Sequence, residues 1–239
     1  MTVSVPVEAI ILAGGLGTRL RSVVRELPKP MAPVAGRPFL ELLIDYWIGQ
    51  GIQHFVLSVS YMGDRIEEHF GNVYRGKRVS YIYEKTPLGT GGGVRQALLS
   101  TKWEKSHLLL LNGDTWYEAS LSQLVSDATA SIKPITMALK PMATNDRYGG
   151  VVINTLNCVI EFDTKNNGQC LVNGGCYLLD IDAVSQCLAL YPEHFSLEQD
   201  FLVPQAREGN VAASIQDKTF LDIGIPADYA TASQVVGVK

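Results

Sequence analysis

The stretch Ala9-Ile10-Ile11-Leu12-Ala13-Gly14-Gly15-Leu16-Gly17-Thr18-Arg19-Leu20 decides the fold. Its apolar half, Ala9–Ala13, predicts a buried strand, and the glycines that follow predict a loop whose backbone N–H groups approach an anion closely. Neither common glycine-rich motif matches. A P-loop has lysine before its last hydroxyl residue, and the dinucleotide fingerprint has a third glycine where Leu20 stands. On the glycines alone, a tight strand–helix turn without a ligand stays open.

Strand and helix patterns alternate through the first half of the chain. Helical spacing of apolar residues spans Phe39–Ile48, and shorter helical patterns include Ile66–Phe70 and the residues through Leu98 and Leu99. Apolar runs that predict strands lie between them, at Phe55–Val59, Val79–Tyr83 and Leu108–Leu111. Repeated units of this length predict an α/β fold, with a Rossmann-like, doubly wound, mostly parallel mixed sheet.

The pattern changes near residue 134, where strands follow one another with few helices between them. We expect this portion to add antiparallel strands, with a hairpin turn at Asn154–Asn157. Ser196, followed by Gln199, is typical of a helix N-cap. The strands expected here are Ile135–Leu139, Gly150–Ile153, Val159–Phe162, Gly175–Leu179, Val211–Ile215 and Thr219–Leu221, and the helices are Ala183–Leu190, Glu198–Ala206 and Pro226–Ser233.

Composition excludes several function classes. The chain has 239 residues, 46% hydrophobic and 18% charged, which argues against disorder. A net charge of −4 gives no general basic field for nucleic acid or an anionic membrane. No apolar run approaches the roughly 18 residues of a membrane span, and no secretory signal is evident. The four cysteines form no CxxC pair, so we expect free thiols and a cytoplasmic protein.

A second basic signal, Pro28-Lys29-Pro30-Met31, lies ten residues after Arg19. Two prolines fix the backbone around one lysine, which suits a lysine that must point at a phosphate. Together with Gly14–Arg19, this segment resembles the signature of sugar-1-phosphate nucleotidyltransferases. Further segments resemble the same family along nearly the whole chain: Glu84 with Pro87–Gly92, Leu111–Asp114, Asn173–Gly175, Ser196–Glu198 and Asp222–Pro226.

Within that family, Pro28–Pro38 and Ser196–Phe201 resemble most the short bacterial D-glycero-α-D-manno-heptose 1-phosphate guanylyltransferases. The resemblance implies one domain over residues 1–239, with 1–133 mainly binding the nucleotide and 134–239 mainly binding the sugar phosphate. It implies no appended β-helix domain, since no hexapeptide array follows. The product would be a GDP-heptose for surface polysaccharides or S-layer glycans.

The reaction that the resemblance implies is attack of a sugar 1-phosphate oxygen on the α-phosphorus of GTP, with pyrophosphate leaving. Fixed cations and Mg²⁺ would offset the repulsion between the two anions. The catalytic residues would be Arg19, Lys29, Asp114 and Asp222. Nucleotide contacts would come from Leu12, Gly14, Gly15, Gly17, Thr18, Arg19, Glu84, Pro87, Gly89 and Thr90, and sugar-phosphate contacts from Gly113, Arg147, Tyr148, Lys165, Asn173, Gly174 and Glu198.

Asp114 and Asp222 each end an apolar strand, where ligands of open α/β sheets bind. Each carboxylate alone also fits a turn or helix cap. The resemblance implies that both bind one Mg²⁺, a hard cation that prefers oxygen ligands. Asn173 and Gly174 would recognise sugar hydroxyls, together with Glu198, although a turn and a first-turn helix carboxylate are the alternatives.

Glu84 indicates which base is bound. A carboxylate only accepts hydrogen bonds, and guanine presents two adjacent donors, N1–H and the N2 amino group. Adenine and cytosine place an acceptor at the first of these positions, and uracil and thymine have a single donor. Glu84 therefore predicts GTP as the donor, unless it pairs with Lys85 or Arg78.

No general base is expected, because a phosphate monoester is already an anionic nucleophile near neutral pH. For this reason we expect no catalytic role for the four histidines and expect most of them at the surface: His54, His69, His107 and His194. The alternatives are a mannose-1-phosphate guanylyltransferase, a related uridylyltransferase and a non-catalytic regulatory subunit, the last disfavoured by the presence of the basic and acidic site residues. A homo-oligomer is left open.

Overall fold

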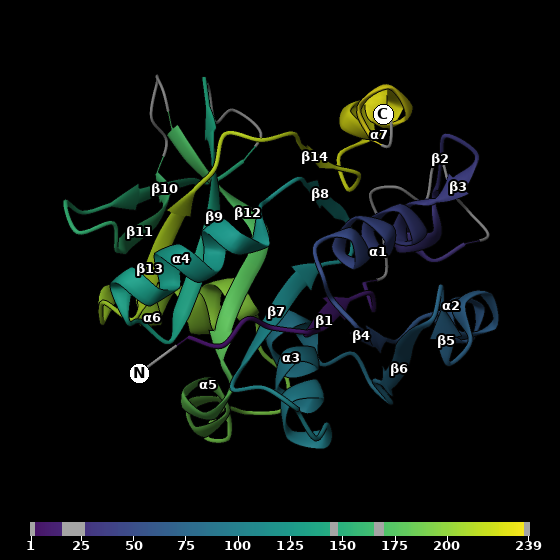
Figure 1. The fold of residues 1–239 in the computed structure, drawn as a ribbon, viewed down its shortest axis with the longest axis horizontal. Helices are drawn as coiled ribbons and strands as arrows, with labels where there is room; N and C mark the ends of the chain where they lie inside the picture. The colour runs from purple at the N-terminus through teal and green to yellow at the C-terminus, as the bar shows by residue number, and fades with distance from the viewer. Residues whose placement is uncertain (1–2, 16–26, 144–147, 165–169, 237–239) are drawn as a thin grey trace.

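A computed structural model describes residues 3–15, 27–143, 148–164 and 170–236. Its centre is a parallel sheet (Figure 1) in the order β6 (Lys77–Tyr83), β4 (His54–Val59), β1 (Glu8–Leu12) and β7 (His107–Asn112). The chain moves outward from β1 through β4 to β6 and then returns to place β7 on the other side of β1. The switch point between β1 and β7 is where open sheets of this class bind ligands.

The second half of the chain extends the sheet with antiparallel strands, which confirms the mixed sheet. Strand β12 (Cys170–Asp180) pairs with β7 and with β9 (Ile135–Met142). The hairpin β10 (Gly150–Ile153) and β11 (Val159–Thr164) lies beyond β12, and β13 (Val211–Ile215) runs parallel to β9. The short β5 (Val73–Tyr74) pairs with β6 at the opposite edge.

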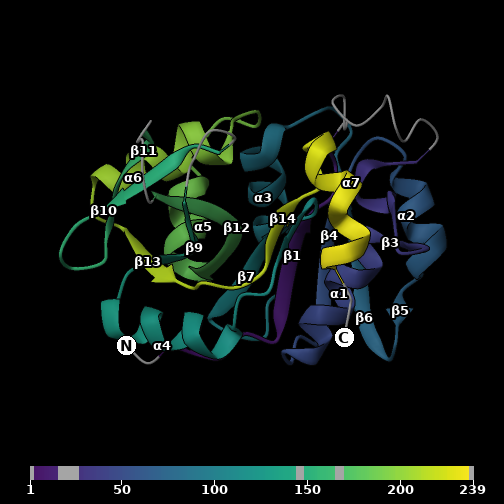
Figure 2. The same cartoon turned by 90° about the horizontal axis from the view of Figure 1, so that it is seen from above.

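Helices cover both faces of the sheet (Figure 2), as the doubly wound pattern predicts. Successive residues of β1 serve opposite faces, since Ile11 packs in the core beneath α1 (Phe39–Gly49) and α2 (Gly63–Phe70). Ile10 packs in the core beneath α3 (Gly89–Ser100) and α5 (Ile181–Leu188). Both side chains are fully buried, and each such burial contributes about 1.5–3 kcal/mol.

Several elements lie outside the sequence-based expectation. Helix α4 (Leu121–Ser131) is capped by Ser120, whose Oγ accepts from the Gln123 N–H at 3.3 Å. Few of its residues are buried, which explains its weak apolar pattern. Short strands also went unrecognised, namely β2 (Pro33–Val34), β3 (Arg37–Pro38) and β8 (Thr115–Tyr117), the last paired with β14 (Phe220–Asp222).

The helix expected at 198–206 consists of two pieces. Ser196 caps the first as expected, accepting from the Gln199 N–H at 3.2 Å. The first piece, η2 (Leu197–Leu202), is π-helical, and α6 (Val203–Arg207) follows it. Pro204 has no N–H to continue a regular ladder at this junction. The 3₁₀ turn η1 (Lys29–Met31) and helix α7 (Pro226–Val235) complete the elements, and no helix in the described part of the chain is long and apolar enough to cross a membrane.

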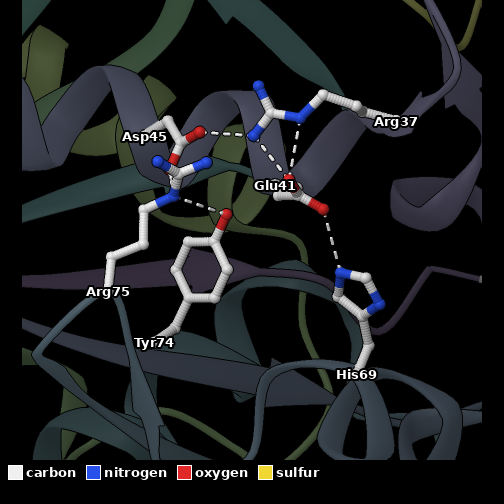
Figure 3. Close-up of polar contacts among 6 residues, drawn as sticks. All are labelled: Arg37, Glu41, Asp45, His69, Tyr74 and Arg75. Atoms are coloured by element: carbon white, nitrogen blue, oxygen red, sulfur yellow. Dashed lines mark hydrogen bonds and ion pairs between the residues drawn. The ribbon is translucent and has the colours of Figure 1, made fainter.

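A network of charged side chains, here called the rim network, joins β3, α1, α2 and the turn after β5 (Figure 3). Arg37 Nε donates to Glu41 Oε1 at 2.8 Å, and Arg37 also pairs with Asp45. Arg75 Nε lies 2.8 Å from Asp45 Oδ1, and His69 Nε2 lies 3.1 Å from Glu41 Oε2. Burial raises the pKa of Glu41, but hydrogen bonds from Arg37 and His69 outweigh it and leave that pKa below its ordinary value.

Candidate active site

A cavity of about 480 Å³ opens at the carboxyl ends of the parallel strands. Because β1, β4, β6 and β7 all end at this edge, residues distant in sequence meet there. Its lining includes many residues expected from the sequence: Leu12, Gly14, Gly15, Lys29, Glu84, Pro87, Gly89, Thr90 and Asp114. It also includes Pro30, Ser60 and Asn112, which were not among the expected ligand contacts, and His194, for which no role was expected.

Gly14, just after β1, leaves room for the side chain of Glu84, which follows β6. A Cβ on Gly14 would lie 2.9 Å from Glu84 Oε1, and one on Gly93 would lie 3.0 Å from the same oxygen. Ser60 adds a contact, because its hydroxyl donates to the Gly14 carbonyl. The first glycine therefore makes room for a carboxylate of this chain, which motif reasoning about anions did not anticipate.

Glu84 is oriented by two donors of its own chain. Ser58 Oγ donates to Oε1 at 3.2 Å, and the Leu88 N–H donates to Oε2 at 3.1 Å. Arg78, considered above as an ion-pair partner, instead lies 3.5 Å from Glu8 and 3.6 Å from Glu104. Glu84 thus presents a fixed carboxylate to the cavity, and each of its oxygens retains capacity to accept another bond.

The base-binding segment expected at Pro87–Gly92 lies against residues 193–195. The Gly91 N–H donates to the Phe195 carbonyl at 3.0 Å, and the Phe195 N–H donates to the Leu88 carbonyl at 3.1 Å. Gly89 has φ +71°, and a Cβ there would lie 2.6 Å from the Phe195 carbonyl oxygen. These glycines let a second backbone lie directly on the start of α3, which brings His194 to the cavity.

Lys29 occupies the short turn η1 between Pro28 and Pro30, with Pro28 extended at ψ 145°. Its side chain is only 15% exposed, and its ammonium pairs with Asp114. A Cβ on Gly224 would lie 2.2 Å from Lys29 Nζ and 2.8 Å from Asp222 Oδ1. The structure therefore brings Lys29, Asp114 and Asp222 together around Gly224.

Asp222 reaches this cluster through the small sheet of β8 and β14, in which it pairs with Thr115, the residue after Asp114. The Ile223 N–H donates to the Asp114 carbonyl at 3.0 Å, and the Gly224 N–H donates to Asp222 Oδ1 at 2.6 Å. Burial, and then the charge of Asp114, raise the pKa of Asp222 to about 6. Two carboxylates that repel one another are poised to bind a cation.

The donor set fits Mg²⁺. Within the residues that the structure describes, no group of three or more His, Cys, Asp or Glu side chains is placed to hold a metal ion. Mg²⁺ is commonly held by one or two carboxylates together with waters and substrate phosphates. Asp114 and Asp222 supply that minimum, and the buried charge of Asp222 is the kind that a divalent cation relieves.

Asn173 and Glu198, both expected to contact the sugar, lie together. Asn173 Nδ2 is 3.3 Å from Glu198 Oε2 and 2.7 Å from the Tyr177 hydroxyl, so Tyr177 joins this group although the sequence did not point to it. Asn173 Oδ1 also accepts from the Gly175 N–H at 3.0 Å.

The other expected sugar contacts have structural neighbours. A Cβ on Gly174 would lie 2.4 Å from the Tyr117 ring, so glycine there is required for packing. A Cβ on Gly113 would lie 2.4 Å from the Leu12 carbonyl oxygen, so this glycine holds β7 close to β1. The Tyr148 hydroxyl donates to Asp228 at the start of α7. Gly17, Thr18, Arg19, Arg147 and Lys165 lie outside the described residues, and their roles stay predictions.

The histidines require a correction. His54 and His107 are buried, at 5% and 8% exposure, whereas most of the four were expected at the surface. His54 Nδ1 lies 3.1 Å from Glu8 Oε1, and Nε2 lies 2.9 Å from Ser80 Oγ. Burial lowers the pKa of both His54 and His107. The acidic partners of these two histidines, Glu8 and Asp180, lie at the end of the sheet opposite the cavity. The burial of the histidines was not predicted because a strand pattern does not show which side chains have buried partners.

Comparison with known proteins identifies relatives of nearly equal length. A D-glycero-α-D-manno-heptose 1-phosphate guanylyltransferase of Aneurinibacillus thermoaerophilus is 42% identical over 95% of this chain and 97% of its own. An enzyme of the same name from Campylobacter jejuni is 43% identical over 93% of this chain and 96% of its own. The crystal structure of HddC from Yersinia pseudotuberculosis, complexed with GMP-PN, superposes with a TM-score of 0.83 at 34% identity, covering 95% of this chain and 98% of that one.

The family model described as nucleotidyl transferase matches residues 8–237. That range contains the whole cavity, the Lys29–Asp114–Asp222 cluster and the Asn173–Glu198 pair. The structural match covers 95% of this chain with a TM-score of 0.83, which confirms the fold expected from the sequence. The chain belongs to the nucleotidyl transferase family.

Proposed function

We propose that this chain transfers GMP from GTP to D-glycero-α-D-manno-heptose 1-phosphate, giving GDP-heptose and pyrophosphate. The observation that carries the proposal is one cavity with Glu84 at one part of its lining and the Lys29–Asp114 pair at another. A fixed carboxylate suits guanine, and the basic and acidic pair suits a triphosphate with its counterion. The full-length similarity to two heptose 1-phosphate guanylyltransferases supports the acceptor.

Each residue has a part in this chemistry. The acceptor's phosphate oxygen forms a bond to the α-phosphorus, and the bond from that phosphorus to the bridging oxygen of pyrophosphate breaks. The Lys29 ammonium offsets negative charge on the transferred phosphoryl group, and Arg19 is proposed to do so on the leaving phosphates. Mg²⁺, held by Asp114 and Asp222, would supply further neutralisation. Asn173 and Glu198 would bind acceptor hydroxyls.

The decisive experiment measures pyrophosphate release by the purified chain with Mg²⁺. Donors are GTP and UTP, and acceptors are heptose, mannose and glucose 1-phosphates. We expect the highest kcat/KM with GTP and the heptose. A higher value with UTP would overturn the base assignment, and a higher value with mannose 1-phosphate would overturn the acceptor assignment. No release with any pair would favour the non-catalytic alternative.

The setting of the reaction extends this proposal. We propose that the GDP-heptose serves a surface glycan such as a lipopolysaccharide, a capsule or an S-layer glycan, and that the enzyme works in the cytoplasm. Within the described part of the chain, Cys158, Cys176 and Cys187 form no disulfide, which agrees with a reducing compartment. Extracts of a strain lacking the gene should retain heptose 1-phosphate and lack GDP-heptose, and normal GDP-heptose would contradict the proposal.

A further inference from the structure

His194 has an unusual position in the cavity. Among the residues that the structure describes, the rest of the lining comes from residues 12–114, and only His194 comes from the second half of the chain. It is exposed, whereas its neighbour Phe195 is 3% exposed and packs against Tyr191 with ring centroids 4.9 Å apart. Phe195 therefore anchors the segment in the core while His194 faces the cavity.

The backbone on both sides of His194 is held against the start of α3. Phe195 exchanges two backbone hydrogen bonds with Leu88 and Gly91. A Cβ on Gly92 would lie 2.1 Å from the Glu193 carbonyl oxygen, so this contact is as close as glycine allows. The Leu197 N–H donates to Thr90 Oγ1 at 2.9 Å. The position of His194 is thus fixed from both directions.

The neighbours of His194 indicate which part of the GTP donor it would contact. Leu88, which bonds Phe195, also donates its N–H to Glu84, the residue proposed to read guanine. The charged groups suited to phosphates and their counterion are those of Lys29 and Asp114. Lys29 lies in η1 and Asp114 lies just after β7, away from the start of α3. His194 therefore lies with the base-binding segment, where a flat imidazole can pack on a nucleoside.

We propose that His194 contacts the guanosine of the donor and sets its affinity, an inference that rests on the proposed function. Guanosine is common to GTP and the GDP-sugar product, and it is absent from pyrophosphate and from the sugar 1-phosphate. A guanosine contact must therefore affect the first two ligands and spare the other two. Contacts to the phosphate tail or to the sugar would give different patterns.

The test measures His194→Ala in both directions of the reaction. Packing of an aromatic side chain on a base predicts a rise of about tenfold in KM for GTP and for GDP-heptose. KM for heptose 1-phosphate and for pyrophosphate should stay as in the parent chain, and calorimetry without acceptor should show the same weakening of GTP binding. Glu193→Ala is the matched control, since its exposed side chain neighbours His194 and faces a different cavity.

Three outcomes would overturn the assignment: unchanged KM for GTP, a matching rise for pyrophosphate, or a rise confined to heptose 1-phosphate. An unchanged melting temperature shows that the variant remains folded. Should the parent chain prefer UTP, the proposed donor is wrong but the same measurement with UTP and its product still tests His194. The failure of one proposal is thereby separated from the failure of the other.

Discussion

The rim network and the Lys29–Asp114–Asp222 cluster are both assemblies of charged side chains, but their carboxylates respond in opposite directions. In the rim network, Arg37 and Arg75 face Glu41 and Asp45, and the pKa of Glu41 falls below its ordinary value. In the cluster, counting only residues that the structure describes, one lysine faces two aspartates, and the pKa of Asp222 rises to about 6. A network with equal numbers of positive and negative side chains stabilises the fold. A cluster with excess negative charge is instead suited to bind a positively charged ligand.

The largest expected effect comes from removing one of the negative charges of the cluster. Asp222→Asn keeps the shape and an acceptor for the Gly224 N–H but removes a charge that the fold tolerates poorly. We expect kcat to fall by at least about 10²–10³-fold while the melting temperature is unchanged or higher. Asp114→Asn should lose as much activity. Normal turnover in either variant, measured at saturating Mg²⁺, would remove that residue from the proposed metal site.

Gly224→Ala tests the packing of the same cluster without changing any charge. Its Cβ would lie 2.2 Å from Lys29 Nζ, so the ammonium must move away from Asp114 and Asp222. Because misplacement of a catalytic group by about 1 Å can cost about 10²-fold, we expect a loss of that order in kcat. Gly49→Ala is the control, since no atom lies within 4 Å of the added Cβ. Equal rates in the two variants would argue against the close packing.

Glu84→Gln tests a carboxylate that forms no ion pair with the described residues and is instead held by Ser58 and the Leu88 N–H. The amide replaces one acceptor by a donor, so one of the two guanine contacts is lost. Hydrogen bonds to charged groups contribute about 1.5–3 kcal/mol, and we expect the ratio of kcat/KM for GTP over UTP to fall by tenfold or more. The control is Glu68→Gln, a glutamate with a 67% exposed side chain. An unchanged ratio would dissociate Glu84 from base selection.

Glu41→Gln should show the contrasting behaviour in the rim network. It removes the negative charge that faces Arg37 and His69 and replaces one acceptor oxygen with an amide NH2 group, and partly exposed ion pairs contribute about 0–1 kcal/mol. We expect a loss of free energy of unfolding within that range and unchanged kcat/KM. Urea unfolding and the pyrophosphate assay measure the two quantities, and a large loss of activity would show that the rim network acts on the cavity.

The smallest effect concerns pH. Burial lowers the pKa of His54 from its ordinary value of 6.5, so the unfolded chain takes up a proton more readily than the folded one. This contribution to stability is complete above pH 6.5 and is lost as the pH falls through the folded pKa, at no more than about 1.4 kcal/mol per pH unit. His54→Gln should therefore flatten the urea unfolding free energy between pH 7.5 and 5.5. A slope as steep as that of the parent chain would assign the loss to other groups.

The sequence predicted the fold well where hydrophobic periodicity is strong. The parallel strands, both helical layers, the Ser196 cap and the Asn154–Asn157 turn all appear as expected. Helix α4 was not predicted because its buried residues are few, and β8 was not predicted because a three-residue strand leaves no periodic signal. The strand expected at Thr219–Leu221 is present as β14, one residue further along the chain. The position of His194 in the cavity lining could not be predicted from a sequence pattern, because long-range backbone hydrogen bonds bring residues 193–195 to α3.

For the candidate site, local motifs placed Lys29, Glu84 and Asp114 around one cavity. What sequence could not show is which atoms of the chain fill the space beside each glycine. Gly14 faces Glu84, Gly174 faces the Tyr117 ring and Gly224 faces Lys29, all through contacts between distant segments. A glycine-rich motif predicts that some group lies close to the backbone. The tertiary structure is needed to tell whether that group belongs to a ligand or to the protein itself.

The start of α3 has a consequence for engineering. Side chains at Gly89, Gly91 and Gly92 would all collide with residues 193–195. A saturation library over these three positions, sorted for folded protein, should return glycine almost exclusively. Diversity aimed at accepting a new nucleotide is better placed at His194, whose side chain is exposed and lines the cavity.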